Sequence, residues 1–420
     1  MKTLKFLSIS LIVCMAVSAL VSCDFQEIDF SKIIKENEKI ENSESSITHN
    51  NISKFDENKT NDDEETSSED NSSENINTSP SKGLEFTSLG NGTCYVSGIG
   101  TCTDIDVIVP SVSPDGDTVV TIYCGNIDDF STIQSITIGK GVNISELYSS
   151  SLQNIYVDEE NEYFKSINGV LYSKDGKELK MYPAGKKETS FSIPESVTTI
   201  GEFAFSGCSS LNEIIIPDSV TSIAKHSFSG CNGLENIVFG NGVTADIVFG
   251  FIHSSNVGDA TSISLSGCSN LKNITIGSGI TSVSISALQQ FSIVNIIVDE
   301  NNENLKSIDG NLYSKDGKTL VFYATGKTNT TFAIPDGVTS IGSGAFAHCT
   351  SLESMVIPKS VTSVGYMAFN GCTNLDTIYY TGSEEDFELI EGVYTSATEF
   401  PLNGGLLVRD ETIIYDYIPE

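Results

Sequence analysis

The phrase IPESVTTIGEFAFSGCSSL occupies residues 193–211, and three close copies of it follow along the chain. These copies begin at Ile216, Ile334 and Ile357. Each copy opens on apolar residues spaced by two, which is the period of a β-strand, and a proline then ends the strand. Such a repeat predicts a solenoid, because one coil is too small to bury its own apolar side and is covered by the next coil.

A shorter pattern, in which three apolar residues are spaced by three and then by two, extends the repeat in both directions. Its last two apolar side chains face the core, and the residue between them faces outward. Stacked coils of this kind predict about eleven strands in one parallel sheet. The clearest copies end on Ile138, Val157, Ile216, Phe239, Ile276, Val298, Ile357 and Tyr380.

A longer repeat lies on top of the coil repeat. Residues 154–201 match residues 295–342 without a gap, at an offset of 141. Both copies contain extra residues, with VLYSKDGKEL in the first and NLYSKDGKTL in the second. An Asp-Gly pair between two apolar alternations is a strong hairpin signal, so we expect an inserted β-hairpin in each copy. The stretch 242–264 follows neither repeat.

The first 23 residues differ from the repeats. Lys2 and Lys5 precede an apolar run, and LVSC closes the segment at Cys23. A basic start, an apolar middle too short to span a bilayer and small residues before a cut predict a secretory signal. LVSC resembles the lipobox of bacterial lipoproteins, which implies that Cys23 becomes the acylated mature N-terminus. An ordinary cleaved signal, with Cys23 there by chance, is the alternative.

Residues 24–83 are rich in Asn, Ser, Asp and Glu and poor in apolar residues. Because so little apolar surface cannot offset the entropy of ordering, we predict a disordered acidic tether.

The whole chain carries 56 acidic and 23 basic residues, a net charge of −33. This charge argues against nucleic-acid binding and against docking on anionic lipid, because both need clustered Lys and Arg. We therefore expect contact with the membrane through the N-terminal lipid only.

The consensus of the four best copies, I-P-x-x-V-T-x-I-G-x-x-A-F-x-x-C-x-x-L, resembles the BspA-like leucine-rich repeat family of bacterial surface proteins. The resemblance covers residues 104–380. It implies a β-rich solenoid, a right-handed leucine-rich repeat superhelix with a parallel concave sheet, here with inserted β-hairpins and β caps. Members of the family are surface adhesins and interaction proteins rather than enzymes, so the resemblance implies exposure at the bacterial cell surface.

Caps are expected because an open solenoid end exposes both the core and a strand edge. The implied organisation is a lipoprotein signal peptide at 1–23, the tether at 24–83, an N-terminal β cap and first rung at 84–112, the repeat array at 113–380 and a C-terminal cap at 381–420.

The cysteines divide into two groups. Cys94 and Cys102 lie in the predicted cap of an exported protein, where they can form a disulfide. Five others share one repeat position, where we expect small, buried, unreactive thiols. They are Cys208, Cys231, Cys268, Cys349 and Cys372.

Because the sequence has no C-x-x-C pair, zinc-protease motif, phosphate loop or nucleophile elbow, we predict no metal site, no cofactor and no enzymatic activity.

The outward position of each strand offers a candidate binding strip for a partner. Its apolar members are Tyr156, Ile215, Val238, Ile297, Val356 and Tyr379, and a polar column of Ser, Asn, Glu and Thr runs beside them. β-Branched and aromatic residues suit any sheet surface, and this plainer interpretation stays open. As a binding surface, the strip predicts adhesion to a protein on a host or neighbouring cell. Carbohydrate capture or a structural role in the envelope is the alternative function.

The four best copies also carry an Ala-Phe or Ser-Phe pair at a fixed offset, so we expect one large ring per coil in the core. Phe346→Ala should therefore lower the free energy of unfolding by about 3–5 kcal/mol, because the cavity cannot close fully. Denaturant unfolding measures the change. Tyr366→Ala, at a variable position of the neighbouring copy, is the control and should cost much less. Equal costs for the two variants would contradict the solenoid register.

Overall fold

A computed structural model describes residues 79–123, 130–147, 149–249, 262–285, 291–394, 406–407 and 412–418. Contacts divide the chain into Met1–Glu74 and Asn75–Glu420, and every described residue belongs to the second unit. The predicted signal peptide with Cys23, and residues 24–78 of the predicted tether, lie outside the described residues. In the described part, no helix has the length and apolar character needed to cross a bilayer.

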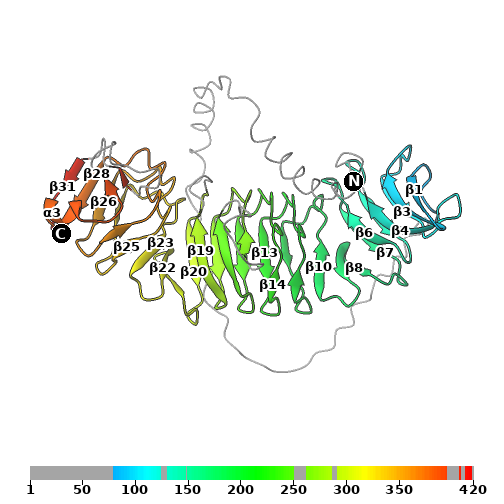
Figure 1. The fold of residues 1–420 in the computed structure, drawn as a ribbon, viewed down its shortest axis with the longest axis horizontal. Helices are drawn as coiled ribbons and strands as arrows, with labels where there is room; N and C mark the ends of the chain where they lie inside the picture. Colours follow the sequence, from blue (N-terminus) through cyan, green and yellow to red (C-terminus); the bar gives the residue numbers. More distant parts are fainter. Residues whose placement is uncertain are drawn as a thin grey trace, which may run out of the picture. The chain divides into compact units, whose positions relative to one another are not determined.

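Parallel strands, one from each coil, form the core-facing ladders of the fold (Figure 1). They belong to three separate sheets, which we call the first, second and third repeat sheets. The first contains β3 (Asp106–Val109), β5 (Ser135–Ile138) and β7 (Asn154–Val157). The second contains β11 (Ser190–Ser192), β13 (Glu213–Ile216), β15 (Asn236–Phe239), β18 (Asn273–Ile276) and β20 (Asn295–Val298). The third contains β24 (Thr331–Ala333), β26 (Ser354–Ile357), β28 (Thr377–Tyr380) and β31 (Thr412–Ile414).

The register within each repeat sheet keeps equivalent residues side by side. In the second sheet Ile214 pairs with Ile237, Ile237 with Ile274, and Ile274 with Ile296. These four side chains are buried, whereas the residue after each of them faces outward and is only partly buried or exposed. The β-rich leucine-rich repeat solenoid predicted from the sequence is therefore confirmed.

The predicted single sheet is wrong, because two insertions divide it. The first insertion comprises β8 (Phe164–Ile167), β9 (Val170–Ser173) and β10 (Glu178–Met181), and the second comprises β21 (Leu305–Ile308), β22 (Asn311–Ser314) and β23 (Thr319–Phe322). The N–H of Ile155 in β7 donates to the carbonyl of Gly169 at 2.9 Å, and that of Ile296 in β20 donates to Gly310 at 3.0 Å. A hairpin turn thus occupies the place at which the next strand would pair.

Each insertion is an antiparallel three-stranded unit rather than the two-stranded hairpin we predicted. Its last strand starts a second ladder on the other side of the coils. β10 pairs in parallel with β12 (Thr199–Ile200), which pairs with β14 (Ser222–Ile223). β23, β25 (Ser340–Ile341) and β27 (Ser363–Val364) repeat this arrangement. From β7 to β15 every strand has a counterpart 141 residues later, so the sequence duplication is also a structural one.

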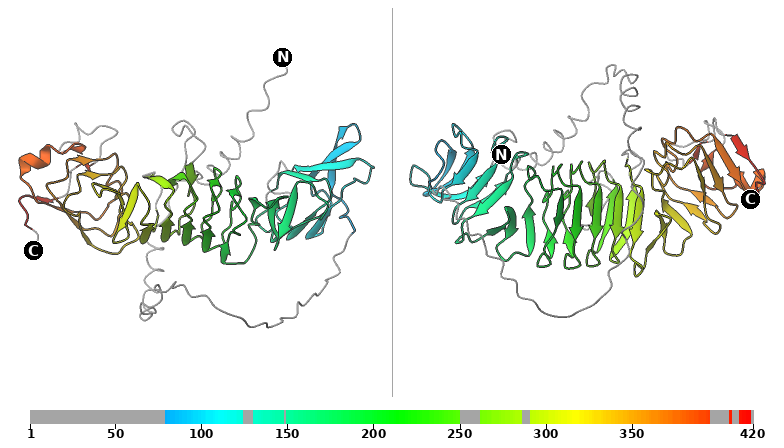
Figure 2. Two further views of the ribbon diagram at one scale, coloured as in Figure 1. Left: turned by 90° about the horizontal axis from the view of Figure 1, so that it is seen from below. Right: turned by 180° about the vertical axis from the view of Figure 1, so that it is seen from behind.

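The ends of the array are covered by other elements, shown from two further sides in Figure 2. At the N-terminal end, β1 (Glu85–Gly90), β2 (Thr93–Gly98), β4 (Thr118–Tyr123) and β6 (Asn143–Glu146) form a sheet. Ser81, which the sequence assigned to the tether, exchanges two hydrogen bonds with Ile108 of β3, both of 3.0 Å. At the C-terminal end, Ser383 caps the short helix α3 (Glu384–Glu388) with Asp386 in a capping box.

The stretch 242–264, for which the repeats gave no account, contributes strands of its own. β16 (Ala245–Phe249) lies between β17 (Ser262–Ser264) and β19 (Ile280–Ile285) in a parallel sheet. Its Ile247 and Phe249 are fully buried, so this part of the stretch continues the core although it departs from the consensus.

Aromatic rings stack from coil to coil inside the core. Phe205 lies 5.7 Å from Tyr182 and 5.5 Å from Phe228, between ring centroids. In the second copy Phe346 lies 5.3 Å from Tyr323 and 5.1 Å from Phe369. The expectation of one large ring per coil is confirmed for these coils, and each column begins on a tyrosine that follows an insertion.

Two buried asparagines attach the insertions to the preceding coils. The amide nitrogen of Asn302 donates to the carbonyls of Gly277 and Ile280, both at 2.9 Å. Its amide oxygen accepts the N–H groups of Asn304 at 2.9 Å and Leu305 at 2.8 Å. Asn161 makes the equivalent four bonds at the first insertion. The sequence analysis missed both residues because they lie in acidic, turn-like stretches.

Asn302→Ala should lower the free energy of unfolding by about 3–5 kcal/mol, because it leaves buried backbone groups without partners. The neighbouring Asn301 is exposed. Asn301→Ala is therefore the matched control and should change stability by about 0.5 kcal/mol or less. Urea unfolding followed by circular dichroism measures both variants. Similar midpoints for Asn302→Ala and Asn301→Ala would show that the buried amide does not stabilise the insertion.

Candidate partner-binding surface

The six residues of the predicted strip lie on all three repeat sheets. Ile215, Val238 and Ile297 share the second sheet, where the register places Thr275 between Val238 and Ile297. Val356 and Tyr379 are paired neighbours in the third sheet. Tyr156 lies in the first sheet beside Thr137. The strip is therefore three separate apolar segments rather than one continuous column, since each insertion interrupts it.

The strip residues differ in their exposure for a structural reason. Tyr156 is 42% exposed and Ile297 is 46% exposed, whereas the other four are only partly exposed. Within a sheet, the outward side chains of both neighbouring strands cover part of each residue. β7 and β20 have such a neighbour on one side only, because a turn follows each of them on the other side. The two residues at the sheet ends are thus the most accessible members of the strip.

Polar side chains beside the strip are ordered by hydrogen bonds between coils. The amide of Asn273 donates to that of Asn236 at 2.7 Å, and the hydroxyl of Ser190 donates to Glu213 at 3.1 Å. In the first sheet, Ser135 donates to Asp106 at 2.6 Å. A surface held in this way loses little side-chain entropy when a partner binds.

The third segment contains residues that the sequence analysis missed. Ile414 of β31 pairs with Tyr379 and is 41% exposed, and the ring of Tyr417 lies 4.6 Å from that of Tyr379. Sequence reasoning placed these residues in the C-terminal cap. In β31 Ile413 packs against the core and Ile414 faces outward, and this alternation could have revealed the strand.

The repeat cysteines form hydrogen bonds inside the core. The thiol of Cys231 donates to the carbonyl of Phe205 at 3.0 Å, and that of Cys372 donates to Phe346 at 3.0 Å. Each thiol thus satisfies a carbonyl that belongs to an aromatic residue of the preceding coil. Burial raises the pKa of Cys208 and of Cys349, so their thiols stay protonated. Four of the five are buried as expected, and Cys372 is only partly buried.

The predicted disulfide is not present in the structure. Cys94 and Cys102 are both free thiols, Cys94 being buried in β2 and Cys102 partly exposed. Burial is also the main cause that raises the pKa of Cys94.

Iodoacetamide added to the native protein should label Cys102 and leave Cys208, Cys231 and Cys268 unlabelled, because only the exposed thiolate reacts. Denaturant should expose all four, and mass spectrometry of the peptides reads the labelling at each site. If Cys102 is labelled only after reduction, a disulfide forms in the expressed protein. Rapid native labelling of the three repeat cysteines would contradict their burial.

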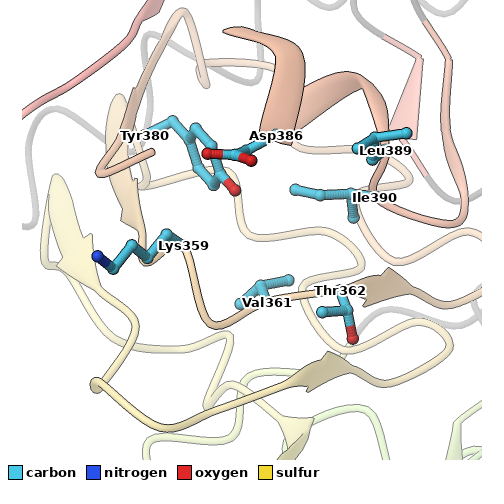
Figure 3. A pocket seen from close by; sticks show the side chains of 7 residues that line it. All are labelled: Lys359, Val361, Thr362, Tyr380, Asp386, Leu389 and Ile390. Atoms are coloured by element: carbon cyan, nitrogen blue, oxygen red, sulfur yellow. The ribbon is translucent and has the colours of Figure 1, made fainter. Parts of the chain in front are cut away.

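A pocket of about 330 Å³ lies beside α3, at the low end of the volumes typical of ligand pockets. It is lined by Lys359, Val361, Thr362, Tyr380, Asp386, Leu389 and Ile390. Figure 3 shows Tyr380 beside Asp386, with the ammonium group of Lys359 pointing away from both. Burial, with a smaller contribution from Asp386, raises the pKa of Tyr380.

Across the described residues, no group of three or more His, Cys, Asp or Glu side chains could hold a metal ion.

Comparison with known families identifies the repeats. A model of the BspA type leucine rich repeat region matches residues 184–318 and 318–388, with six copies. Residues 184–388 are therefore BspA-type leucine-rich repeats, and the resemblance seen in the sequence is confirmed over this range. The match begins at residue 184, whereas the sequence predicts that the resemblance begins at residue 104. The strands β3, β5 and β7, which precede the match, already form a parallel sheet.

Solved structures provide three further comparisons. A leucine rich cell surface protein from Faecalibacterium prausnitzii A2-165 is 25% identical over 65% of this chain and 54% of its own, with a TM-score of 0.31. A leucine-rich repeat protein from Eubacterium ventriosum ATCC 27560 is 23% identical over 65% and 60%, with a TM-score of 0.36. The pneumococcal vaccine antigen PcpA is 14% identical over 81% and 98%, with a TM-score of 0.34.

The chain thus spans less than two thirds of the first two structures. With TM-scores this low, the family assignment rests on the repeat match. No curated protein matches the sequence.

Proposed function

We propose that this chain is a bacterial cell-surface protein, anchored by a lipid on Cys23, whose repeats bind a protein on a host or neighbouring cell. The observation that carries the proposal is the outer face of the second repeat sheet. There Ile215, Val238, Thr275 and Ile297 lie in register as one solvent-facing column. Natural interfaces have an apolar centre and a polar rim, and this face offers both.

The polar rim lies two residues before the apolar column along each strand, on the same face of the sheet. Glu213, Asn236, Asn273 and Asn295 are paired in register there. Lys272 and Glu235 form a salt bridge of 3.0 Å on neighbouring coils at the start of the strands. Backbone and rim are therefore fixed before a partner arrives, and binding needs little reorganisation of this surface.

The proposed anchor and tether give this surface access to partners outside the cell. Two or more acyl chains on Cys23 would hold the chain stably at the membrane. Like charges on the acidic residues of 24–78 would keep the tether extended and the repeats away from the lipid. Both parts of the proposal rest on the sequence alone.

The double variant Ile215→Asp with Val238→Asp should weaken binding by at least about tenfold, because it places two carboxylates in the centre of the interface. Surface plasmon resonance against a panel of purified host-surface and matrix proteins measures the loss. Leu89→Asp with Tyr366→Asp is the control, since both residues are exposed apolar residues outside the repeat sheets. A panel protein that binds the double variant as tightly as the wild type would overturn the proposal.

Carbohydrate capture is the second candidate, and one observation favours it. Tyr379 and Tyr417 place two rings 4.6 Å apart on the third segment, and paired aromatic rings suit the faces of sugars. A glycan-array signal that survives Ile215→Asp with Val238→Asp but disappears in Tyr379→Ala would favour this function over protein binding.

A further inference from the structure

The two insertions create the same kind of surface twice. Tyr156 and Ile297 are equivalent residues of the duplication, and each lies on the last strand before an insertion. Each copy also has one further exposed apolar residue, at positions that the duplication does not relate to each other. Ile167 is the last residue of β8, before the turn whose Gly169 carbonyl bonds to β7, and it is 40% exposed. Val294 lies directly before β20 and is 42% exposed. Most other exposed apolar residues of the described part lie on turns, caps or chain ends.

Carboxylates begin two residues after each of the apolar residues Tyr156 and Ile297. After β7 the chain reads Asp158, Glu159, Glu160 and, one residue later, Glu162, and after β20 it reads Asp299, Glu300 and Glu303. Asp158 and Asp299 accept the N–H two residues further on, both at 2.8 Å. These local bonds fix the turns and direct the remaining acidic side chains into solvent.

Most of these carboxylates have no cationic partner in the described part of the chain. Glu160 pairs with Lys140 at 2.9 Å. The ammonium groups of Lys174 and Lys315 bond to the backbone carbonyls of Glu159 and Glu300, both at 2.8 Å, and not to their side chains. Glu159, Glu162, Glu300 and Glu303 are exposed. Each site is therefore an exposed apolar residue followed by a turn that carries more carboxylates than ammonium groups.

From this geometry we propose that Tyr156 and Ile297 are the centres of two equivalent docking sites for a basic protein segment. The segment inserts an apolar side chain beside Tyr156 or Ile297, and its Lys or Arg residues pair with the glutamates of the following turn. The net charge of −33 favours such a partner over distance and speeds its association. The inference rests on the proposed protein-binding function and adds to it the position of the sites and the chemistry of the partner.

Two sites on one chain have a consequence for affinity. A partner that carries the basic apolar motif twice can occupy both, and the second contact then forms within the complex. The sites also differ, because Tyr156 can stack on an arginine whereas Ile297 cannot. The first site should therefore prefer Arg over Lys more strongly than the second.

Three synthetic peptides of equal length test the sites by fluorescence polarisation with the full chain. The first alternates Arg with Leu, the second alternates Glu with Leu, and the third alternates Arg with Ser. We expect the Arg/Leu peptide to bind most tightly and to weaken as salt is raised. Tyr156→Asp or Ile297→Asp alone removes one of two equivalent sites and should weaken binding only about twofold, whereas the double variant should weaken it by well over tenfold. Glu159→Gln with Glu162→Gln should reduce the salt dependence at the first site.

Tyr366→Asp is the matched control, because Tyr366 is 44% exposed but lies on a turn outside the repeat sheets. Unchanged Arg/Leu binding in Tyr156→Asp with Ile297→Asp, or equal binding of the Arg/Ser peptide, would overturn the inference.

Ile215→Asp with Val238→Asp separates the two proposals when a panel protein is the ligand. If only this pair abolishes binding, the function stands and the docking sites are wrong; if neither pair matters, both proposals fail.

Discussion

The fold depends on one constraint. A coil of about two dozen residues can neither pair the backbone N–H and C=O groups of its own strand nor cover its own apolar side, so the neighbouring coils must do both. The consequence is strict register. Ile214, Ile237 and Ile274 are paired in line, and a slip of one residue would turn each of them toward solvent. The stacked rings and the thiol-to-carbonyl bonds repeat because this register repeats. Any feature that interrupts a sheet must therefore provide a substitute for the missing strand.

Both insertions provide that substitute with the same device, a glycine carbonyl presented to the last strand. Gly169 and Gly310 have φ values of +75° and +72°, and a Cβ on either would collide with the amide of Asn154 or Asn295. Glycine adopts this positive φ without strain, and its missing Cβ leaves room for the asparagine side chain. Because the turn carries no side chain at this point, it pairs the backbone of β7 or β20 and leaves the outward residue uncovered. Ending the sheet and exposing Tyr156 or Ile297 have the same physical cause.

Much of this fold could be predicted from the sequence, because the signals for strands, proline stops and ring positions recur at fixed offsets. The division of the sheet could not, since the decisive contact is the one between Ile155 and Gly169, and nothing in the local pattern shows which backbone group a turn approaches. The buried asparagines were hidden for a similar reason. Asn161 and Asn302 stand among exposed acidic residues, and only the tertiary fold brings four buried backbone groups around each of them. The strip residues were found by strand period, whereas their grouping into three segments required the structure.

The duplicated halves show which residues the scaffold needs. Asn161, Gly169 and Lys174 return unchanged as Asn302, Gly310 and Lys315, and each makes the same backbone contact in both copies. Outward positions return changed: Tyr156 becomes Ile297, and the Glu188 that pairs with Lys186 at 3.0 Å becomes Asn329. Residues that satisfy buried backbone groups cost several kcal/mol to replace, whereas outward side chains cost little. A duplicated segment of this kind can therefore carry two different recognition surfaces on one scaffold without loss of stability.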